Sequence, residues 1–296
     1  MSREAPRTVV VDAVRRALAE DLEPLGDLTA SLLDADATGV LVIASRQVGV
    51  IAGQACVREA FAQVDSTIVV EVAAPDGTAV GPGDVVATVR GSMVSILSAE
   101  RTALNFLGHL SGVATQTRLL VDAVSAVSPT TRVLDTRKTT PGLRALEKAA
   151  VRAGGGTNHR ASLSDAVLLK DNHLGAIGIS IGVARAKVMW PGRNVEVECD
   201  TLEQVAEAAE ARATSVLLDN MTPDEAAVAA ALARSIHPGI LVEVSGNISL
   251  ATAPLYAACG VDLISVGALT HSAPVLDLGL DLVIDKAGGD TGSEEP

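Results

Sequence analysis

The stretch VEVECDTLEQVAEAAEARATSVLLDN, residues 195–220, decides the fold. It begins and ends with short apolar runs that are typical of buried strands, and an Ala-rich run with helical character separates them. Thr201 and, three residues later, Gln204 form a capping box, which predicts the first turn of a helix at this point. A strand, a helix and a second strand in so short a stretch predict a βα unit with parallel strands.

Similar units lie on both sides of this stretch. Further strand-like runs are RVLD at 132–135, AVLLKD at 166–171, ILVEVS at 240–245 and DLISVG at 262–267. Thr222, Pro223 and Glu225 form a second capping box with Pro at the first helical position, which predicts another helix. This alternation predicts a parallel sheet, either closed as a barrel or doubly wound. No GxGxxG motif follows the first strand, so the pattern does not support a dinucleotide-binding sheet.

The position of the polar residues favours the barrel. A polar residue or a glycine stands at or just after the end of each strand-like run: Arg137 and Lys138, Lys170, Glu198, Asp219, Ser245 and Gly246, and Gly267. In a βα barrel the C-terminal ends of all strands open on one face, where the active site lies. We therefore expect an α/β protein with an irregular βα barrel of parallel strands and with these residues around its mouth.

The upstream residues predict a different kind of structure. Residues 9–22 predict a helix, and residues 39–94 are β-rich, with a short helical run at 57–64. A long helix is expected from Ser98, as its N-cap, to about Val127, with Arg101 on its first turn.

The charge of the chain is unevenly distributed. The chain carries 23 Lys and Arg against 36 Asp and Glu, a formal net charge of −13. This balance argues against a nucleic-acid partner, because phosphate backbones need a broad basic face. Residues 132–170 nevertheless contain eight Lys or Arg and three Asp or Glu. A local cationic excess in an acidic protein indicates a focused field for a small ligand with several negative charges.

Other features of the sequence bear on its cellular location. No apolar run reaches the ~18 residues that span a membrane, and the N-terminus lacks the pattern of a signal peptide. Cys56, Cys199 and Cys259 are far apart and show no spacing typical of a disulfide framework or a metal site. We expect a cytoplasmic protein without a membrane partner. A Gly-rich, acidic tail at 287–296 is expected to be disordered.

Five residues form the expected cationic set: Arg137, Lys138, His159, Arg160 and Lys170. Arg137 and Lys138 follow a strand end. His159 and Arg160 follow a Gly-Gly-Gly turn, and Lys170 lies in an apolar run. These positions are not typical of ordinary solvated charges. Arg recognises carboxylates and phosphates through two parallel hydrogen bonds, so the set predicts an anion-binding pocket. Lys170 also admits a second hypothesis, in which it is the Schiff-base nucleophile of a barrel lyase.

Glu198 and Asp219 form the expected acidic pair. Carboxylate oxygens on adjacent strands suit Mg²⁺, which shares its coordination with substrate phosphates. We expect a Mg²⁺ ion here that in turn holds a pyrophosphate, and salt bridges to pocket cations are the alternative. Glu196 points to the same side of its strand but lies deeper from the mouth, so it ranks below Glu198.

Two turns follow the last two strands, Ser245-Gly246-Asn247 and Val266-Gly267-Ala268. In barrels this position commonly binds a phosphate through backbone N–H groups. Glycine permits close approach, and Asn tolerates the left-handed backbone region. His271 follows closely and can add a donor. The alternative is two unrelated turns.

At these residues the chain resembles the quinolinate phosphoribosyltransferase family, also called the nicotinate-nucleotide pyrophosphorylases. The motifs that carry the resemblance are SAERTALNFLGHLSGVAT (98–115), DTRKTTPGLRALEKAAVRAGGGTNHR (135–160), DAVLLKDNH (165–173), VEVECD, LLDN, EVSGNIS and SVGALTH. Asn247 replaces the Gly of some members, and Ala149 replaces an aromatic residue. The resemblance implies an N-terminal α/β sandwich domain at 1–114, joined by 272–286, and a βα barrel at 115–271.

The resemblance also implies an activity. It is phosphoribosyl transfer from 5-phosphoribosyl-1-pyrophosphate to quinolinate, with decarboxylation to nicotinate mononucleotide, in NAD biosynthesis. A related phosphoribosyltransferase-like protein of metal-transport operons, acting on another acceptor, is the alternative within the family. A protein that binds phosphorylated sugars without turnover is the non-catalytic alternative.

Roles for particular residues follow from the same resemblance. It implies a homodimer with shared active sites, in which Arg101 reaches the site of the other subunit. There it joins Thr136 and the cationic set around quinolinate. The acidic pair, Mg²⁺ and the two turns, with His271, hold the phosphoribosyl donor. The residues with an implied catalytic role are Lys138, Lys170, Glu198 and Asp219.

Overall fold

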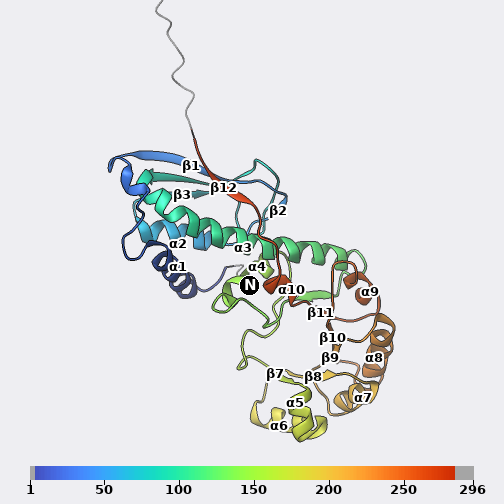
Figure 1. Cartoon of the computed structure of the whole chain (residues 1–296). Helices are drawn as coiled ribbons and strands as arrows, with labels where there is room; N and C mark the ends of the chain where they lie inside the picture. Colours follow the sequence, from blue (N-terminus) through green and yellow to red (C-terminus); the bar gives the residue numbers. More distant parts are fainter. Residues whose placement is uncertain (1–3, 284–296) are drawn as a thin grey trace, which may run out of the picture.

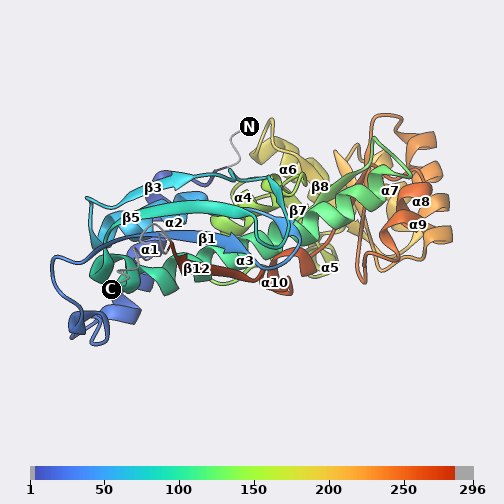
Figure 2. The ribbon, with the colours of Figure 1, turned by 90° about the horizontal axis from the view of Figure 1, so that it is seen from above.

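The computed structural model describes residues 4–283, so the tail expected to be disordered at 287–296 lies outside the described residues. The described chain forms two parts that share one long helix, α3 (Met93–Ser125). Figure 1 shows an antiparallel sheet at one end and a curved parallel sheet with its helices at the other, and Figure 2 shows α3 extending between them. Between residues 4 and 283, no helix combines the length and the apolar character needed to cross a membrane.

The first part is a four-stranded antiparallel sheet covered by helices. In spatial order its strands are β12 (Leu278–Leu282), β1 (Thr38–Ser45), β5 (Val85–Ser92) and β3 (Val69–Val72). It also contains α1 (Arg7–Leu22), α2 (Gln54–Val64), the short helix η1 (Ala30–Leu32) and the strand pair β2 (Gly49–Val50) and β4 (Ala79–Val80). Ile43, Phe61 and Leu107, from β1, α2 and α3, are fully buried in one apolar core. The sheet and the helices therefore form the two layers of a sandwich.

The second part is a six-stranded parallel sheet. In spatial order its strands are β6 (Arg132–Leu134), β11 (Leu263–Ser265), β10 (Leu241–Ser245), β9 (Ser215–Asp219), β8 (Val195–Cys199) and β7 (Val167–Leu169). Its helices are α4 (Arg144–Ala153), α5 (Asp171–Ile177), α6 (Ile179–Met189), α7 (Leu202–Glu210), α8 (Pro223–Ile236), α9 (Ala253–Ala258) and α10 (Ala268–His271). β6 and β7 are the two ends of the sheet, and Thr157 adds a parallel bridge to Leu134. The predicted irregular barrel of parallel strands is confirmed.

The outer face of the parallel sheet is apolar. Val197, Val216 and Ile264 are fully buried in a core that also contains residues of the surrounding helices. Burial of this face holds the helices against the strands and leaves the inner face and the strand ends to polar residues.

The start of α3 differs from the prediction. The helix begins at Met93 and Ser92 is its N-cap, so the predicted start at Ser98 is wrong. Ser98 lies inside the helix, where its hydroxyl donates a hydrogen bond to Val94 O (2.9 Å). Arg101 consequently lies in the third turn instead of the first. The reason is that β5 continues into α3 without a loop, so no turn residues mark the boundary.

The segment before β12 lies directly against α3. Leu276 N donates a hydrogen bond to Gly108 O (3.0 Å). A Cβ atom added to Gly112 would lie 2.0 Å from the carbonyl oxygen of Pro274, and one added to Gly108 would lie 2.9 Å from Val275 Cγ1. These two glycines, one turn apart, therefore let the returning chain approach the helix backbone closely.

We expect Gly112→Ala to lower the free energy of unfolding by about 1–3 kcal/mol, because overpacking against a backbone carbonyl forces the chain to shift. The matched control is Gly175→Ala in α5, where an added Cβ meets nothing within 4 Å. Helix propensity favours that control variant by up to about 1 kcal/mol. Urea denaturation at one protein concentration measures both. A Gly112→Ala protein as stable as the unaltered chain would contradict the close approach.

Candidate active site

Carboxylate side chains occupy the inner face of the parallel sheet. Glu196 and Glu198 share one face of β8, because alternate residues of a strand point to the same side. The register pairs Ser245 of β10 with Asp219 of β9, and Glu243 shares the face of Ser245. The β8–β9 and β9–β10 ladders hold these residues side by side.

The predicted acidic pair lies at the C-terminal ends of neighbouring strands. Lys170, just after β7, forms an ion pair with Glu198 through Nζ and Oε2. Asp219 Oδ2 accepts a hydrogen bond from Asn220 Nδ2 (2.7 Å), and Asn220 N donates to Ser245 O (2.9 Å). These predicted site residues therefore occupy adjoining positions at one barrel mouth.

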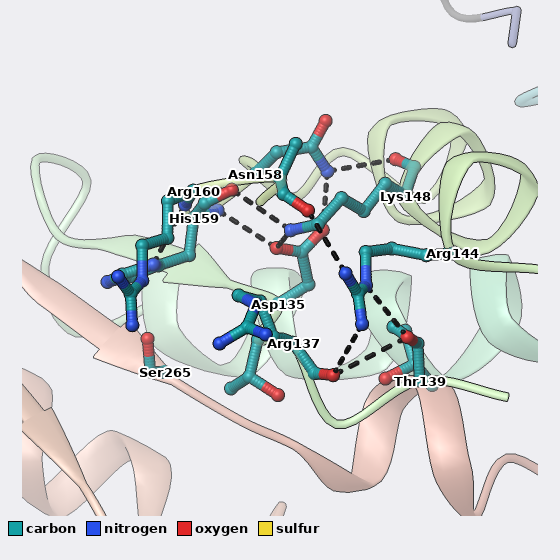
Figure 3. A network of polar contacts seen from close by, with 12 residues as sticks. Asp135, Arg137, Thr139, Arg144, Lys148, Asn158, His159, Arg160 and Ser265 are labelled. Carbon is teal, nitrogen blue, oxygen red and sulfur yellow. Dashed lines mark hydrogen bonds and ion pairs between the residues drawn. The ribbon is translucent and has the colours of Figure 1, made fainter. Parts of the chain in front are cut away.

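Arg137 and Arg160 bring two guanidinium groups near each other (Figure 3). Burial lowers the pKa of the Arg160 guanidinium, and the charge of Arg137 lowers it further. Arg160 Nη1 donates to Ala166 O (3.1 Å), whereas Arg137 Nε is buried and has no hydrogen-bond partner in the described part of the chain. Two neighbouring cations with an unused buried donor fit an anion that carries more than one carboxylate or phosphate group.

His159 lies between these cations and the inner carboxylates. Its Nε2 is 2.9 Å from Glu196 Oε2 and 3.6 Å from Glu243 Oε1. Burial lowers the pKa of His159, but the hydrogen bond to Glu196 and the charge of Glu243 raise it overall. The Arg160 backbone N–H donates to Nδ1 (2.8 Å), so the geometry fits the neutral ring with its proton on Nε2, donated to Glu196.

The strand-end pattern did not reveal Glu243. This residue lies in the middle of β10 and is 1% exposed. Ser265 Oγ donates to its Oε1 (2.5 Å), and its Oε2 has no partner among residues 4–283. Burial, followed by the charge of Glu196, raises the pKa of Glu243 to about 8. Its spacing of two residues from Ser245 was the signal that could have placed it on the inner face.

Glu243→Gln is expected to reduce the pH dependence of stability. The pKa of this carboxyl is about 8 in the folded chain, against an ordinary value of 4.5. The contribution of Glu243 to the free energy of unfolding is therefore fully present below about pH 4.5. It is lost as the pH rises to about 8, at up to about 1.4 kcal/mol per pH unit. Urea denaturation across this range measures the slope, with the exposed Glu210→Gln as control. An unchanged slope in Glu243→Gln would show that Glu243 does not cause it.

Lys138, Gly267 and His271 meet where β6 and β11 end. A Cβ atom added to Gly267 would lie 3.1 Å from Lys138 Cδ and 3.2 Å from His271 Nε2. Thr136 Oγ1 accepts a hydrogen bond from Lys138 N (3.0 Å), which fixes the turn after β6. The second predicted phosphate turn therefore lies beside a predicted cation.

The two predicted phosphate turns differ in backbone conformation. Gly246 and Asn247 follow β10 with φ values of 94° and 50°, so both lie in the left-handed region. A Cβ atom added to Gly246 would lie 2.1 Å from Asn220 Oδ1, so only glycine fits there. In the other turn, Val266 follows β11 and Ala268 is the first residue of α10.

Arg101 does not join these residues within one chain. It lies on α3 and lines a cavity of about 510 Å³ together with Arg16, His109 and residues 141–143. None of the other predicted site residues lines this cavity. The predicted role of Arg101 therefore depends on a second subunit.

The acidic pair at the mouth has the donor chemistry for Mg²⁺. In the described residues, His159, Glu196 and Glu243 form a closer group, with ligand atoms within 4.8 Å of one another, but this group lies deeper in the barrel, where the side chains of Glu196 and Glu243 are 8% and 1% exposed. Glu198 and Asp219 offer two carboxylates at the rim. Mg²⁺ needs only one or two carboxylates where water and phosphate complete its coordination, so these residues fit it.

The fold and the site together define a βα-barrel protein whose mouth suits a small, multiply anionic ligand. Family comparison gives a narrower assignment. The chain belongs to the quinolinate phosphoribosyl transferase family, because the model of the family's N-terminal domain matches residues 27–111 and that of its C-terminal domain matches residues 113–281. The family predicted from the motifs is thereby confirmed.

Related proteins match nearly the whole chain. A probable nicotinate-nucleotide pyrophosphorylase (carboxylating) of Synechocystis is 40% identical over 282 residues, 94% of each chain. The nicotinate-nucleotide pyrophosphorylase (carboxylating) of Mycobacterium leprae is 42% identical, over 92% of this chain and 96% of its own. Among solved structures, the nicotinate-nucleotide pyrophosphorylase of Francisella tularensis has a TM-score of 0.89 and 39% identity, and the match covers 95% of this chain and 98% of that one.

Proposed function

We propose that this protein transfers the phosphoribosyl group of 5-phosphoribosyl-1-pyrophosphate to quinolinate and releases pyrophosphate. Decarboxylation then gives nicotinate mononucleotide and CO₂, a step of NAD biosynthesis. The family and the names of the relatives support this activity. The observation that carries the proposal is the pair Arg137 and Arg160, two like charges held near each other with a buried donor unused. Quinolinate has two adjacent carboxylates and can neutralise both.

Quinolinate is held by the cationic set. Arg137 and Arg160 bind its carboxylates with charge-assisted hydrogen bonds, and Lys170 adds a third positive charge. His159, fixed by its hydrogen bond to Glu196, orients the ring. Holding the acceptor rigidly replaces an encounter in solution with an oriented reaction.

The donor is held by the acidic pair and the two turns. Glu198 and Asp219 bind Mg²⁺ and the ribose hydroxyls, and the 5-phosphate lies against the N–H groups of the turns that contain Gly246 and Gly267. When bound, Mg²⁺ supplies positive charge to the pyrophosphate group. Lys138, beside Gly267, stabilises the negative charge that develops on the leaving pyrophosphate.

The chemistry requires little covalent participation by the protein. The ring nitrogen of quinolinate attacks the anomeric carbon as the bond to the pyrophosphate oxygen breaks. The positive charge of the resulting pyridinium stabilises the carbanion that remains on the ring carbon when the adjacent carboxylate leaves as CO₂, and a proton then adds to that carbon. Positioning and electrostatic stabilisation therefore supply the rate enhancement.

The assembly and the location are part of the proposal. Two copies form a homodimer in which Arg101 completes the mouth of the other subunit, because this residue lies apart from the cationic set of its own chain. We expect each chain to divide into a sandwich domain at 1–114, joined by 272–286, and a barrel at 115–271; residues 1–3 and 284–286 of these ranges lie outside the described residues. Three free cysteines support a reducing compartment, the cytoplasm.

The direct test is incubation of the protein with quinolinate, the phosphoribosyl donor and Mg²⁺. We expect CO₂ and nicotinate mononucleotide in equal amounts, and no product when EDTA removes the metal. Folded protein that yields neither product contradicts the proposal. Borohydride trapping with a carbonyl substrate tests the Schiff-base hypothesis for Lys170, which its ion pair with Glu198 disfavours because a bound ammonium is a poor nucleophile.

A further inference from the structure

A buried ion pair joins the two segments that carry the cationic set. Lys148 of α4 and Asp135, just after β6, pair through Nζ and Oδ1 (Figure 3). Their side chains are 4% and 0% exposed, so neither can touch a ligand in the mouth. Asp135 directly precedes residues 136–138, which form the first cationic segment.

The same pair holds the backbone of the second cationic segment. Asp135 Oδ1 accepts a hydrogen bond from the N–H of His159 (2.9 Å), and Lys148 Nζ donates to the C=O of His159 (2.9 Å). Asn158 Nδ2 donates to Asp135 Oδ2 (2.5 Å) and to Lys148 O (2.9 Å). Oδ1 of Asp135 therefore contacts His159 N and Lys148 Nζ, and Oδ2 accepts a hydrogen bond from Asn158. Both carboxylate oxygens hold this segment in place.

Stability alone does not account for this pair. Burial raises the pKa of Asp135 and lowers that of Lys148, and in both cases it outweighs the opposing effect of the partner's charge. Shape-matched neutral residues often replace a buried ion pair without loss of stability. A role in setting geometry explains why two charges stand where neither reaches solvent or substrate.

We infer that Asp135 and Lys148 are positioning residues that set the spacing between Arg137 and Arg160, and thereby the selectivity for an acceptor with two carboxylates. This inference rests on the proposed function. Arg137 is two residues beyond Asp135, and Arg160 follows the clamped His159, so a shift of the pair moves the two guanidinium groups relative to each other. An acceptor with one carboxylate, such as nicotinate, does not depend on that spacing.

The test is the double variant Asp135→Asn/Lys148→Met, which removes both charges and keeps the side-chain shapes. We expect its midpoint of urea denaturation to remain near that of the unaltered protein. Its KM for quinolinate is expected to rise about tenfold or more, while the KM for the donor changes less than about twofold. The preference for quinolinate over nicotinate, measured as the ratio of kcat/KM, is expected to fall in parallel.

The matched control is Arg234→Met/Asp262→Asn. This pair (2.7 Å) joins Arg234, near the C-terminal end of α8, to Asp262, just before β11, at the N-terminal ends of the strands and away from the mouth. We expect it to leave both KM values unchanged. If the test variant fails to fold, Lys148→Met alone, in which Asp135 keeps its hydrogen bonds from His159 N and Asn158 Nδ2, is measured in the same way.

Two results would overturn the inference: an unchanged KM for quinolinate in the folded double variant, or an equal rise in the KM of both substrates. Calorimetry measures the binding of quinolinate and of nicotinate to the unaltered protein and to the double variant. These measurements separate a failure of the inference from a failure of the proposed function. If the unaltered protein gives no product, selective loss of quinolinate binding still supports the clamp, and equal binding by both proteins contradicts it.

Discussion

Mixing Arg101→Ala chains with Lys170→Ala chains is expected to restore activity that neither variant has alone. In a shared-site homodimer, the mixed dimer has one mouth with an intact Lys170 and an intact Arg101 from the other subunit. Random exchange makes half of the dimers mixed, and each has one intact site of two, so about a quarter of the full activity returns. Product formation after subunit exchange measures the recovery.

The control for this experiment uses two residues of the same mouth. Arg137→Ala and Lys170→Ala chains leave a defect in every site of the mixed dimer, so this mixture is expected to remain inactive. Mass spectrometry of the intact assembly verifies that mixed dimers form. If mixed dimers of Arg101→Ala and Lys170→Ala chains form but have no activity, Arg101 does not act across the interface.

Arg137→Ala is expected to weaken quinolinate binding by about 1.5–3 kcal/mol, because one charge-assisted contact to a carboxylate is lost. Affinity for the phosphoribosyl donor is expected to change much less, since the proposed function places Arg137 on the acceptor side of the mouth. Isothermal titration of each ligand separates the two effects. Arg132→Ala, at the opposite end of β6 and exposed, is the control. Equal losses for both ligands would contradict the assignment of Arg137.

The barrel could be predicted because its signals are local. Apolar runs that end in Glu198 and Asp219 indicated strands with a common mouth. Capping boxes that begin at Thr201 and Thr222 predicted the starts of α7 and α8, and both boxes are present. Each of these signals spans only a few residues, so it can be read without knowledge of what packs against it.

Features that depend on distant partners could not be read in this way. Ser98 has the chemistry of an N-cap, but the direct junction of β5 and α3 gives that place to Ser92. Glu243 has the spacing of an inward residue, yet only its packing near His159 and Glu196 shows that it reaches the site. Hydrophobic periodicity contains no information about such contacts.

Lys148 shows the limit of counting charge. In the sequence it contributed to the cationic excess that indicated an anionic ligand. In the folded chain its charge is buried against Asp135 and is not available to a ligand. The excess of positive charge correctly indicated a local positive field. Which of these charges face the mouth, however, depends on tertiary structure.

The pairing of β12 with β1 has a consequence for synthesis on the ribosome. β1 emerges early, with β5 following on one side, but its other neighbour is residues 278–282. Until those residues have been translated, the free edge of β1 exposes unpaired N–H and C=O groups that any extended peptide can join. We therefore expect chains that stall within the barrel to self-associate through this edge, and chaperones that cover it to raise the yield of native protein.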